Sequence, residues 1–404
     1  MGDINELCQL GDAQMWGRAV ALLVATLFTI VLPSPAVPES LTMTTGLMPH
    51  EPIVIASDMG FTTENGVVAG SGSALDPYLI QGWDINASDA DGITIEGTMS
   101  HFIINDVVVH SGAKFVDGGL LYPSYVGIVL SMTRNCHIQN VTLVDNAAGI
   151  SLDTVYDAVV SECEFRGNAG ALELFQCTNL TISNCSLHDN PWETGTLSLS
   201  SRILFADNTV ARNWDGLQIQ NSNHVSVSRN KFTNTGISLT LSSCADCNVT
   251  SNDFLNSNKA AISITESAGV AVSGNVLMDN GIGVYLTTSS SIRVFRNDFM
   301  DNSMQAYDDS RGTNYWNLEG PVGGNYWSDY TGSDADGNGM GDVPRVITTN
   351  VSDALPLMKP LRGAAQEKGE HALLAPAALL ALLVAVLAIV VVGALMLRRK
   401  KEPR

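Results

Sequence analysis

An acidic, glycine-rich stretch near the C-terminus has the spacing of a calcium-binding loop. Within residues 334–342, oxygen-bearing side chains stand at the first, third, fifth and ninth positions, and a glycine stands at the sixth. A hard cation such as calcium takes oxygen ligands at this spacing, including the backbone carbonyl of the seventh residue, Met340. Arg345 stands where an EF-hand has a bidentate glutamate, and a surface turn that binds nothing explains the same composition. The candidate side-chain ligands are Asp334, Asp336, Asn338 and Asp342.

A second group of candidate residues alternates with apolar residues in short segments, the pattern of half-buried β-strands. Their side chains are nearly all hydroxyls and amides, which could bind sugar hydroxyls without the cost of burying a charge. Serine and threonine are also common on solvated sheet surfaces, so ordinary strand exteriors explain the same pattern. The ligand-binding candidates are Ser198, Ser200, Gln218, Gln220, Ser238, Thr240, Ser263, Thr265, Tyr285 and Thr287.

Asp153 and Glu173 are the candidate catalytic residues. The alternation places them diagonally on the outer face of adjacent strands, with Cα atoms about 8 Å apart from strand and ladder spacings. That arrangement could serve an inverting glycoside hydrolase. However, the chain has 41 acidic residues, and a solvated sheet edge explains two of them equally well. We therefore favour binding over catalysis.

A repeat of 22 or 23 residues must position these side chains. Each copy contains a triplet that reads Asn-x-Phe in its fullest form, and a second file of asparagines follows five residues later. Each copy has short alternating runs and no helical period, so stacked coils about 4.8 Å apart are expected. The asparagines suit the turns, because they tolerate left-handed backbone and can bond to the next coil. The triplets begin at Val141, Cys163, Cys185, Asn208, Asn230, Asn252, Asn275 and Asn297.

The repeat predicts an all-β fold, a right-handed parallel β-helix of roughly nine rungs. Residues 372–397 are uncharged and almost wholly apolar, and basic residues 398–401 follow, which predicts one membrane span with the tail inside. An apolar run before residue 33 predicts a secretory leader. The predicted organisation is a leader at 1–37, an N-terminal cap at 38–90, the coil at 91–317, a C-terminal cap at 318–362, a tether at 363–371, the span at 372–397 and a cytoplasmic tail at 398–404.

Composition limits the possible partners. The formal net charge is −20, and 45% of the residues are hydrophobic. The apolar content is enough for a large core and excludes a disordered chain. The negative charge makes nucleic acid and anionic membrane surfaces poor partners. We expect a single-pass protein of the cell membrane, with most of the chain outside.

Two further segments carry a family resemblance. Residues 76–80 read Asp-Pro-Tyr-Leu-Ile and precede Gly-Trp-Asp-Ile, and residues 324–342 read GNYWSDYTGSDADGNGMGD before Ala-Leu-Pro-Leu-Met-Lys-Pro at 354–360. With the repeat, these segments resemble the NosD-type β-helix proteins over about residues 50–360. That resemblance implies the fold above. The resemblance implies two possible functions. Founding members are periplasmic accessories to copper loading of nitrous oxide reductase, whereas many archaeal surface proteins are similar to the family and have no such role evident.

Copper(I) would require soft ligands. Met278 and Met300 stand one repeat apart in the sequence, and Met304 follows closely. This trio is the copper candidate, although we do not expect copper as a cofactor. The favoured function is a surface-anchored binding or scaffold protein that recognises carbohydrate or another cell-surface component. A polysaccharide-active enzyme and a copper-handling accessory remain the alternatives.

Overall fold

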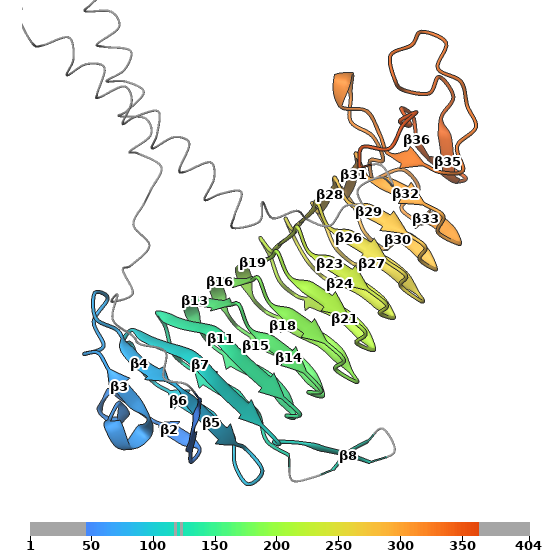
Figure 1. Cartoon of the computed structure of the whole chain (residues 1–404). Coiled ribbons are helices and arrows are strands. Elements are labelled where there is room, and N and C mark those ends of the chain that lie inside the picture. Colours follow the sequence, from blue (N-terminus) through green and yellow to red (C-terminus); the bar gives the residue numbers. More distant parts are fainter. Residues whose placement is uncertain (1–45, 117–118, 122–123, 363–404) are drawn as a thin grey trace, which may run out of the picture.

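The short alternating segments wind into one continuous coil. The computed structural model describes residues 46–116, 119–121 and 124–362, which form a right-handed parallel β-helix of about ten turns (Figure 1). Two sheets run along the coil: sheet A has 21 strands and sheet B has 11. Strands of successive turns pair in parallel and in register, as Gln218 does with Thr240. The predicted all-β, right-handed parallel β-helix is confirmed.

Sheet B takes one strand from each turn. Its outward residues contain most of the candidates named above, so its register decides which of them lie together. In spatial order its strands are β2 (Ile53–Ile55), β6 (Ile93–Glu96), β10 (Ile128–Ser131), β12 (Ala148–Asp153), β15 (Gly170–Phe175), β18 (Glu193–Ser198), β21 (Asp215–Gln220), β24 (Ile237–Ser242), β27 (Ala260–Thr265), β30 (Ile282–Thr287) and β33 (Met304–Asp308).

Sheet A is folded into two strips. The long strands β7 (Phe102–His110) and β11 (Cys136–Val144) span both strips, and each later turn contributes one strand to each. The first strip continues with β13 (Tyr156–Ser161), β16 (Thr178–Ser183), β19 (Ser201–Ala206), β22 (Ser226–Ser228), β25 (Asn248–Thr250), β28 (Ala271–Ser273) and β31 (Arg293–Phe295). The second continues with β14 (Glu164–Arg166), β17 (Ser186–His188), β20 (Thr209–Ala211), β23 (Lys231–Thr233), β26 (Asp253–Leu255), β29 (Val276–Met278), β32 (Asp298–Met300) and β34 (Tyr326–Trp327).

The coil begins earlier than the repeat predicts. Strands β4 (Tyr78–Gln81) and β5 (Trp83–Asn86) lie within the segment predicted as the N-terminal cap, yet both pair in parallel with β7. The coil is therefore longer than the predicted nine rungs. The remaining elements at the N-terminal end are β1 (Met48–His50), η1 (Asp58–Gly60), η2 (Thr63–Asn65) and β3 (Val67–Ala69). A hairpin of β8 (Lys114–Val116) and β9 (Gly119–Leu121) projects from the coil, and η3 (Gly320–Val322), β35 (Arg345–Thr348) and β36 (Val351–Asp353) lie at the C-terminal end.

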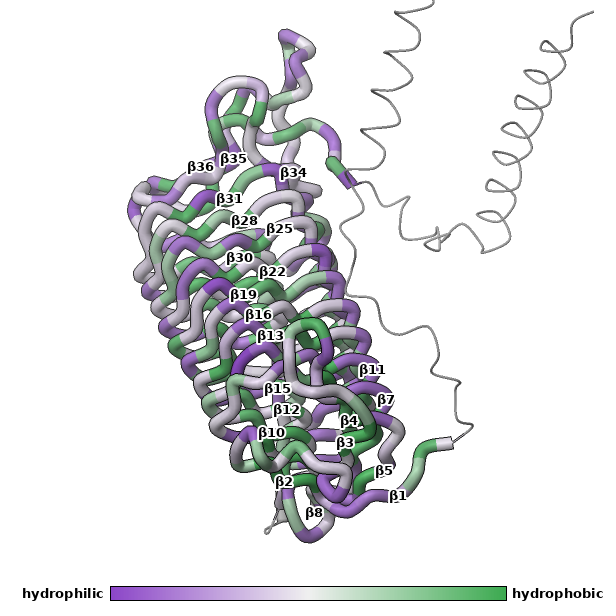
Figure 2. The backbone as a smooth tube through the Cα atoms, turned by 90° about the vertical axis from the view of Figure 1, so that its left-hand side faces the viewer, coloured by the Kyte–Doolittle hydropathy of each residue, from purple (hydrophilic) through white to green (hydrophobic). Residues whose placement is uncertain are grey.

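The core consists of like side chains stacked from turn to turn. Hydrophobic and hydrophilic positions alternate along each coil in Figure 2. The apolar residue two positions after the start of each triplet is fully buried, and the rings of Phe232 and Phe254 stack with centroids 5.0 Å apart. Each turn thus buries its apolar side against its two neighbours, which is how a repeat too small to fold alone becomes stable.

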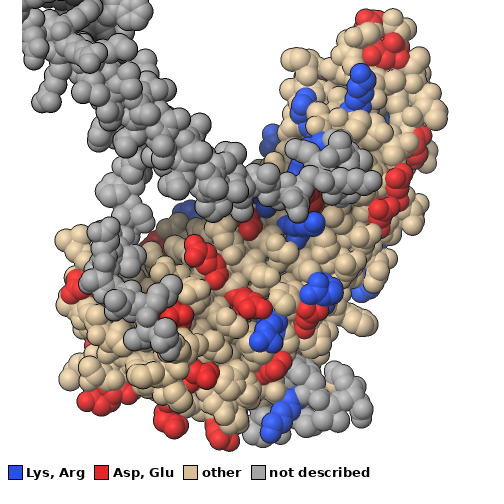
Figure 3. Space-filling view, in the orientation of Figure 1, with Lys and Arg blue, Asp and Glu red and all other residues tan. Residues whose placement is uncertain are grey.

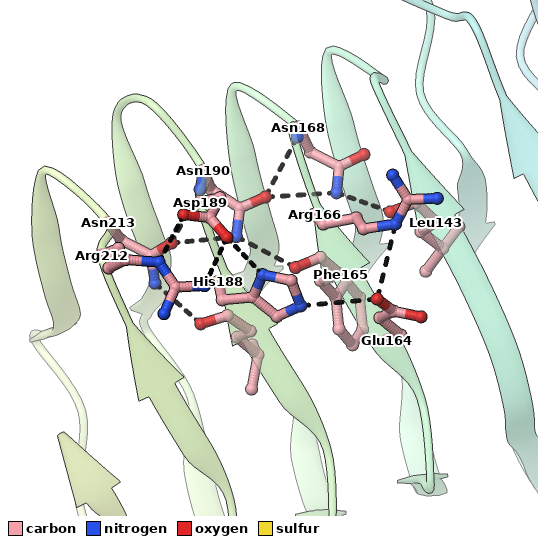
Figure 4. Close-up of polar contacts among 11 residues, drawn as sticks. Leu143, Glu164, Phe165, Arg166, Asn168, His188, Asp189, Asn190, Arg212 and Asn213 are labelled. Atoms are coloured by element: carbon pink, nitrogen blue, oxygen red, sulfur yellow. Dashed lines mark hydrogen bonds and ion pairs between the residues drawn. The ribbon is translucent and has the colours of Figure 1, made fainter. Parts of the chain in front are cut away.

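The asparagines of the two files are buried and link successive turns by hydrogen bonds. The backbone N–H and the side-chain Nδ2 of Asn230 both donate to Oδ1 of Asn252, at 2.8 and 3.0 Å, and Nδ2 also donates to the carbonyl of Phe205 at 2.8 Å. The second asparagine file, five residues after the start of each triplet, makes the same contacts, as Figure 4 shows for Asn168 and Asn190. The predicted bonding of both asparagine files to the next coil is confirmed.

The left-handed backbone lies elsewhere than expected. The asparagines of the two files, called here the ladder asparagines, do not have positive φ. The residue before each one does, as at Arg229 (φ 56°) and Ser251 (φ 59°). Because the preceding residue makes the bend, the asparagine itself is free to hold its amide in line with the next turn. Its short amide is therefore needed for hydrogen bonding and not for turn geometry.

No helix among residues 46–116, 119–121 and 124–362 is long and apolar enough to span a bilayer. The predicted leader, tether, membrane span and cytoplasmic tail all lie outside these residues.

We predict that Asn252→Ala destabilises the coil by about 2–4 kcal/mol, because it removes the acceptor of two buried donors of Asn230. Asn248→Ala, at an exposed position of the neighbouring strand, is the matched control and should change the free energy of unfolding by less than about 0.5 kcal/mol. Urea unfolding followed by circular dichroism measures both. Equal losses in the two variants would contradict a ladder role.

Candidate functional site

The outer face of sheet B carries two straight files of side chains. The strand register stacks residues of successive turns directly above one another, so each file has one side chain per turn, about 4.8 Å apart. The first file, in order, is Ser151, Glu173, Thr196, Gln218, Thr240, Ser263, Tyr285 and Tyr307. The second file is Asp153, Phe175, Ser198, Gln220, Ser242, Thr265 and Thr287.

Two of the ligand-binding candidates are not on this face. Ser200 is 1% exposed, and its hydroxyl accepts a hydrogen bond from the backbone of Cys177 at 3.0 Å. It follows Leu199, whose left-handed backbone (φ 51°) ends the alternation of β18. Ser238 is fully buried and hydrogen-bonded to Ser257 at 2.6 Å, because two successive residues point inward near the start of β24. The placement of both residues on the outer face was wrong.

Three members of the files were missed. Thr196 precedes Gln218 by one repeat, Ser242 follows Gln220 by one, and Tyr307 follows Tyr285 by one. The ring of Tyr307 stacks on that of Tyr285 with centroids 5.1 Å apart and an interplanar angle of 18°. Counting one repeat from a known outward residue would have found all three.

The two candidate catalytic acids lie as expected, diagonally on β12 and β15. A third carboxylate joins them: Glu193 accepts hydrogen bonds from Thr196 Oγ1 at 2.9 Å and from Gln218 Nε2 at 2.5 Å. Partial desolvation, and then the charge of Glu193, raise the pKa of Glu173 above that of an ordinary glutamate, against a lowering contribution from the Ser151 hydroxyl. A proton is therefore held more tightly on Glu173 than on a free glutamate, which is the property of a general acid.

The charge of this face is one-sided. The strands of sheet B contain no lysine or arginine, whereas Glu96, Asp153, Glu173, Glu193 and Asp215 all lie at solvent-accessible positions of them. Acidic side chains also outnumber basic ones over the N-terminal end of the surface shown in Figure 3. A negatively charged polymer would be repelled here.

Sheet A carries paired charges instead. Asp189 binds Arg212 through two hydrogen bonds of 2.7 and 2.6 Å and His188 through a third of 2.6 Å, and His188 also approaches Glu164 at 3.4 Å (Figure 4). Arg212, and then His188, lower the pKa of Asp189 to about 2. These charges satisfy one another, so this network fits a solvated exterior better than a ligand site.

The acidic loop near the C-terminus is ordered by its own amides. The carboxylate of Asp334 accepts hydrogen bonds from the N–H groups of Gly337 (2.8 Å), Asn338 (3.1 Å) and Gly339 (2.9 Å). Asp342 Oδ2 likewise accepts from the N–H of Ala335 at 2.7 Å. Within the part of the chain that the structure describes, no cluster of three or more His, Cys, Asp or Glu residues could hold a metal ion.

The methionine trio is only partly brought together. Met278 and Met300 are register partners on β29 and β32 of sheet A, and Met300 is buried. Met304 belongs to β33 of sheet B and is 47% exposed. Two thioethers in register are too few for a defined copper(I) centre without further soft ligands.

Comparison with known proteins identifies the family. The family model described as periplasmic copper-binding protein (NosD) matches residues 80–332. No curated protein matches the sequence. The A-module of the mannuronan C-5 epimerase AlgE6 from Azotobacter vinelandii is similar in structure, with a TM-score of 0.51 and 14% identity over 62% of this chain and 77% of that one. The surface adhesin PfbA of Streptococcus pneumoniae has a TM-score of 0.47 and 13% identity over 58% and 71% of the two chains. At such identities the likeness to the epimerase shows a shared fold.

Proposed function

The chain belongs to the NosD family, and from that premise we propose that it is a surface β-helix protein that binds carbohydrate along the outer face of sheet B. One observation carries the proposal: the first file holds Thr196, Gln218, Thr240 and Ser263 on four successive turns and continues into the stacked rings of Tyr285 and Tyr307. A rigid row of donors and acceptors at a fixed spacing suits a polymer of hydroxyl-bearing units. The neutral side chains would bind without the cost of stripping water from charges.

The family description supports the copper-handling alternative, but the two methionines in register support it only weakly. The raised pKa of Glu173 favours a second candidate function, the polysaccharide-active enzyme. A glycan array probed with the purified full-length chain separates these candidates. Binding without turnover supports recognition, cleavage or epimerisation of a bound glycan supports catalysis, and no interaction with any glycan rejects both.

We predict that Gln218→Arg combined with Thr240→Arg reduces binding to the glycan found on the array by at least about tenfold, since two long cationic side chains would obstruct the middle of the first file. Ser226→Arg combined with Ala271→Arg places the same side chains on β22 and β28 of sheet A and should leave binding unchanged. Both doubles should keep the wild-type melting transition. Normal binding by the sheet B double would move recognition away from this face.

A structural calcium site at the C-terminal cap remains a proposal. The candidates Asp334, Asp336, Asn338 and Asp342 have suitable spacing with the Met340 carbonyl, and the amides around Asp334 would hold its carboxylate in place. We predict that millimolar calcium raises the melting temperature of the full chain relative to chelator, because a ligand that binds only the native state stabilises it. Asp336→Ala should remove most of the increase, whereas Glu319→Ala, an exposed acid of the same cap, should not. An unchanged melting temperature in calcium rejects the site.

Anchoring of the chain in the cell membrane through residues 372–397 is likewise a proposal, motivated by the apolar run and the basic residues after it. Protease added to intact cells should release the β-helix and spare a tag placed after residue 404. Loss of that tag from intact cells would show the opposite orientation or no span.

A further inference from the structure

Two tryptophans project into solvent at the edge of sheet B. Trp192 and Trp214 immediately precede β18 and β21, and the N–H of Asp215 donates to the carbonyl of Trp192 at 2.9 Å, so they occupy the same position on consecutive turns. Their side chains are 45% and 69% exposed. Indole has a large apolar surface, and leaving two such surfaces in water on adjacent turns is unfavourable unless a ligand covers them.

The next two turns have a glycine and a lysine at this position. The N–H of Gly236 donates to the carbonyl of Trp214 at 2.7 Å, and the N–H of Lys259 donates to the carbonyl of Gly236 at 2.9 Å. The column therefore runs Trp192, Trp214, Gly236, Lys259. Gly236 has no side chain, so no side chain of its turn stands between the indole of Trp214 and Lys259, and the carboxylate of Asp215 occupies the space next to it. A Cβ atom at Gly236 would clash with the carboxylate of Asp215 and with the carbonyl of Trp214.

Trp214 and Gly236 line a shallow, open cavity of about 360 Å³. Arg212, Asn234 and Asn258 contribute polar groups to its wall. At its rim, Lys259 Nζ lies 6.0 Å from the Trp214 ring centroid and 3.7 Å from Asp215 Oδ1. The volume is at the lower end of the range for small-ligand pockets. One flat aromatic wall facing several hydrogen-bonding groups suits a single ring that has an apolar face and polar edges.

We propose that this cavity, called here the Trp214 slot, binds one pyranose ring of an uncharged glycan. The inference rests on the proposed function and deepens it by assigning an anchor and a ligand class. The sugar ring lies against the indole of Trp214, and its hydroxyls bond to Lys259, Asp215 and Asn258. Trp192 covers the ring that follows. Gln218 lies four residues after Trp214 along β21, about 13 Å at the usual rise of a strand, so a glycan of several rings can contact both the slot and the first file.

Charge selects against acidic sugars. Glu193 and Asp215 begin the two strands that Trp192 and Trp214 precede, and the cation of Lys259 is shared with Asp215. The only charged residue that lines the slot is Arg212, whose guanidinium is already paired through its two hydrogen bonds to Asp189. A uronate ring would therefore find no unpaired cation among the described lining residues and would lie near the carboxylate of Asp215, whereas a neutral hexose or N-acetylhexosamine carries no charge to be repelled.

The test uses the full-length chain and four linear probes: cellohexaose, mannohexaose, chitohexaose and a hexamer of mannuronate. Tryptophan fluorescence and calorimetry measure binding. We expect at least one neutral probe to bind and to shift the emission, with Trp214→Ala weakening that binding at least about tenfold and Trp214→Phe retaining most of it. Tyr315→Ala, which removes an aromatic side chain that is 57% exposed at the C-terminal end of the coil, is the matched control and should bind normally.

The possible outcomes separate the two proposals. Normal binding of a neutral probe by Trp214→Ala, together with its loss in the Gln218→Arg and Thr240→Arg double, overturns the slot and keeps the proposed function. Mannuronate as the tightest probe overturns the assigned ligand class. Binding of none of the four probes overturns both.

Discussion

The ladder asparagines donate their backbone N–H groups toward the C-terminal end of the coil, so the residue that ends the ladder must differ from the others. From Asn208 to Asn297, each asparagine that begins a triplet gives two N–H groups to one oxygen of the next turn, so the last member of this file must be an acceptor that needs no further partner. Asp353 fills that position: its Oδ2 accepts from the backbone of Asn325 at 2.7 Å and from Trp327 Nε1 at 2.9 Å. Burial raises the pKa of Asp353, and these donors oppose that rise. An aspartate accepts on both oxygens, whereas another asparagine would have pointed an amide N–H at an existing donor.

Because the ladders hold every turn in register, the exterior of the coil is as ordered as its interior. Side chains with no contact through the core still line up, as Tyr285 and Tyr307 do. Substituting one outward residue changes one position in a file and leaves the ladder intact. Function can therefore vary on this surface while the fold is maintained, which explains why a family match and a shared fold do not identify the ligand.

The repeat made the fold predictable, because a 22-residue period with asparagine at one position admits few architectures. The same period would have predicted that Thr196, Ser242 and Tyr307 point outward from sheet B. Errors arose where local backbone departs from strict alternation: Leu199 turns left-handed before Ser200, and Ser238 belongs to a pair of inward residues. The first turns were missed because their strands do not carry the Asn-x-Phe triplet. The Trp214 slot depends on Gly236 lying between Trp214 and Lys259 in space, which the sequence shows only once the exact register is known.

The two sheets differ in how the charges on their outer faces are paired. On sheet A, Asp189 with Arg212, Asp207 with Arg229, and Asp253 with Arg362 form ion pairs at 2.6, 2.8 and 2.8 Å. Such exposed pairs contribute little to stability, but the charges within each pair offset one another. The strands of sheet B contain acids but no lysine or arginine, and of these acids Asp215 pairs with Lys259, which precedes β27, so the outer face keeps a negative potential. Nothing in the packing of the coil requires this asymmetry, since the inward side chains of both sheets are mainly apolar. Repulsion of anionic polymers and of the same face on a second copy is a consequence, and a neutral glycan is the kind of polymer that such a face would still admit.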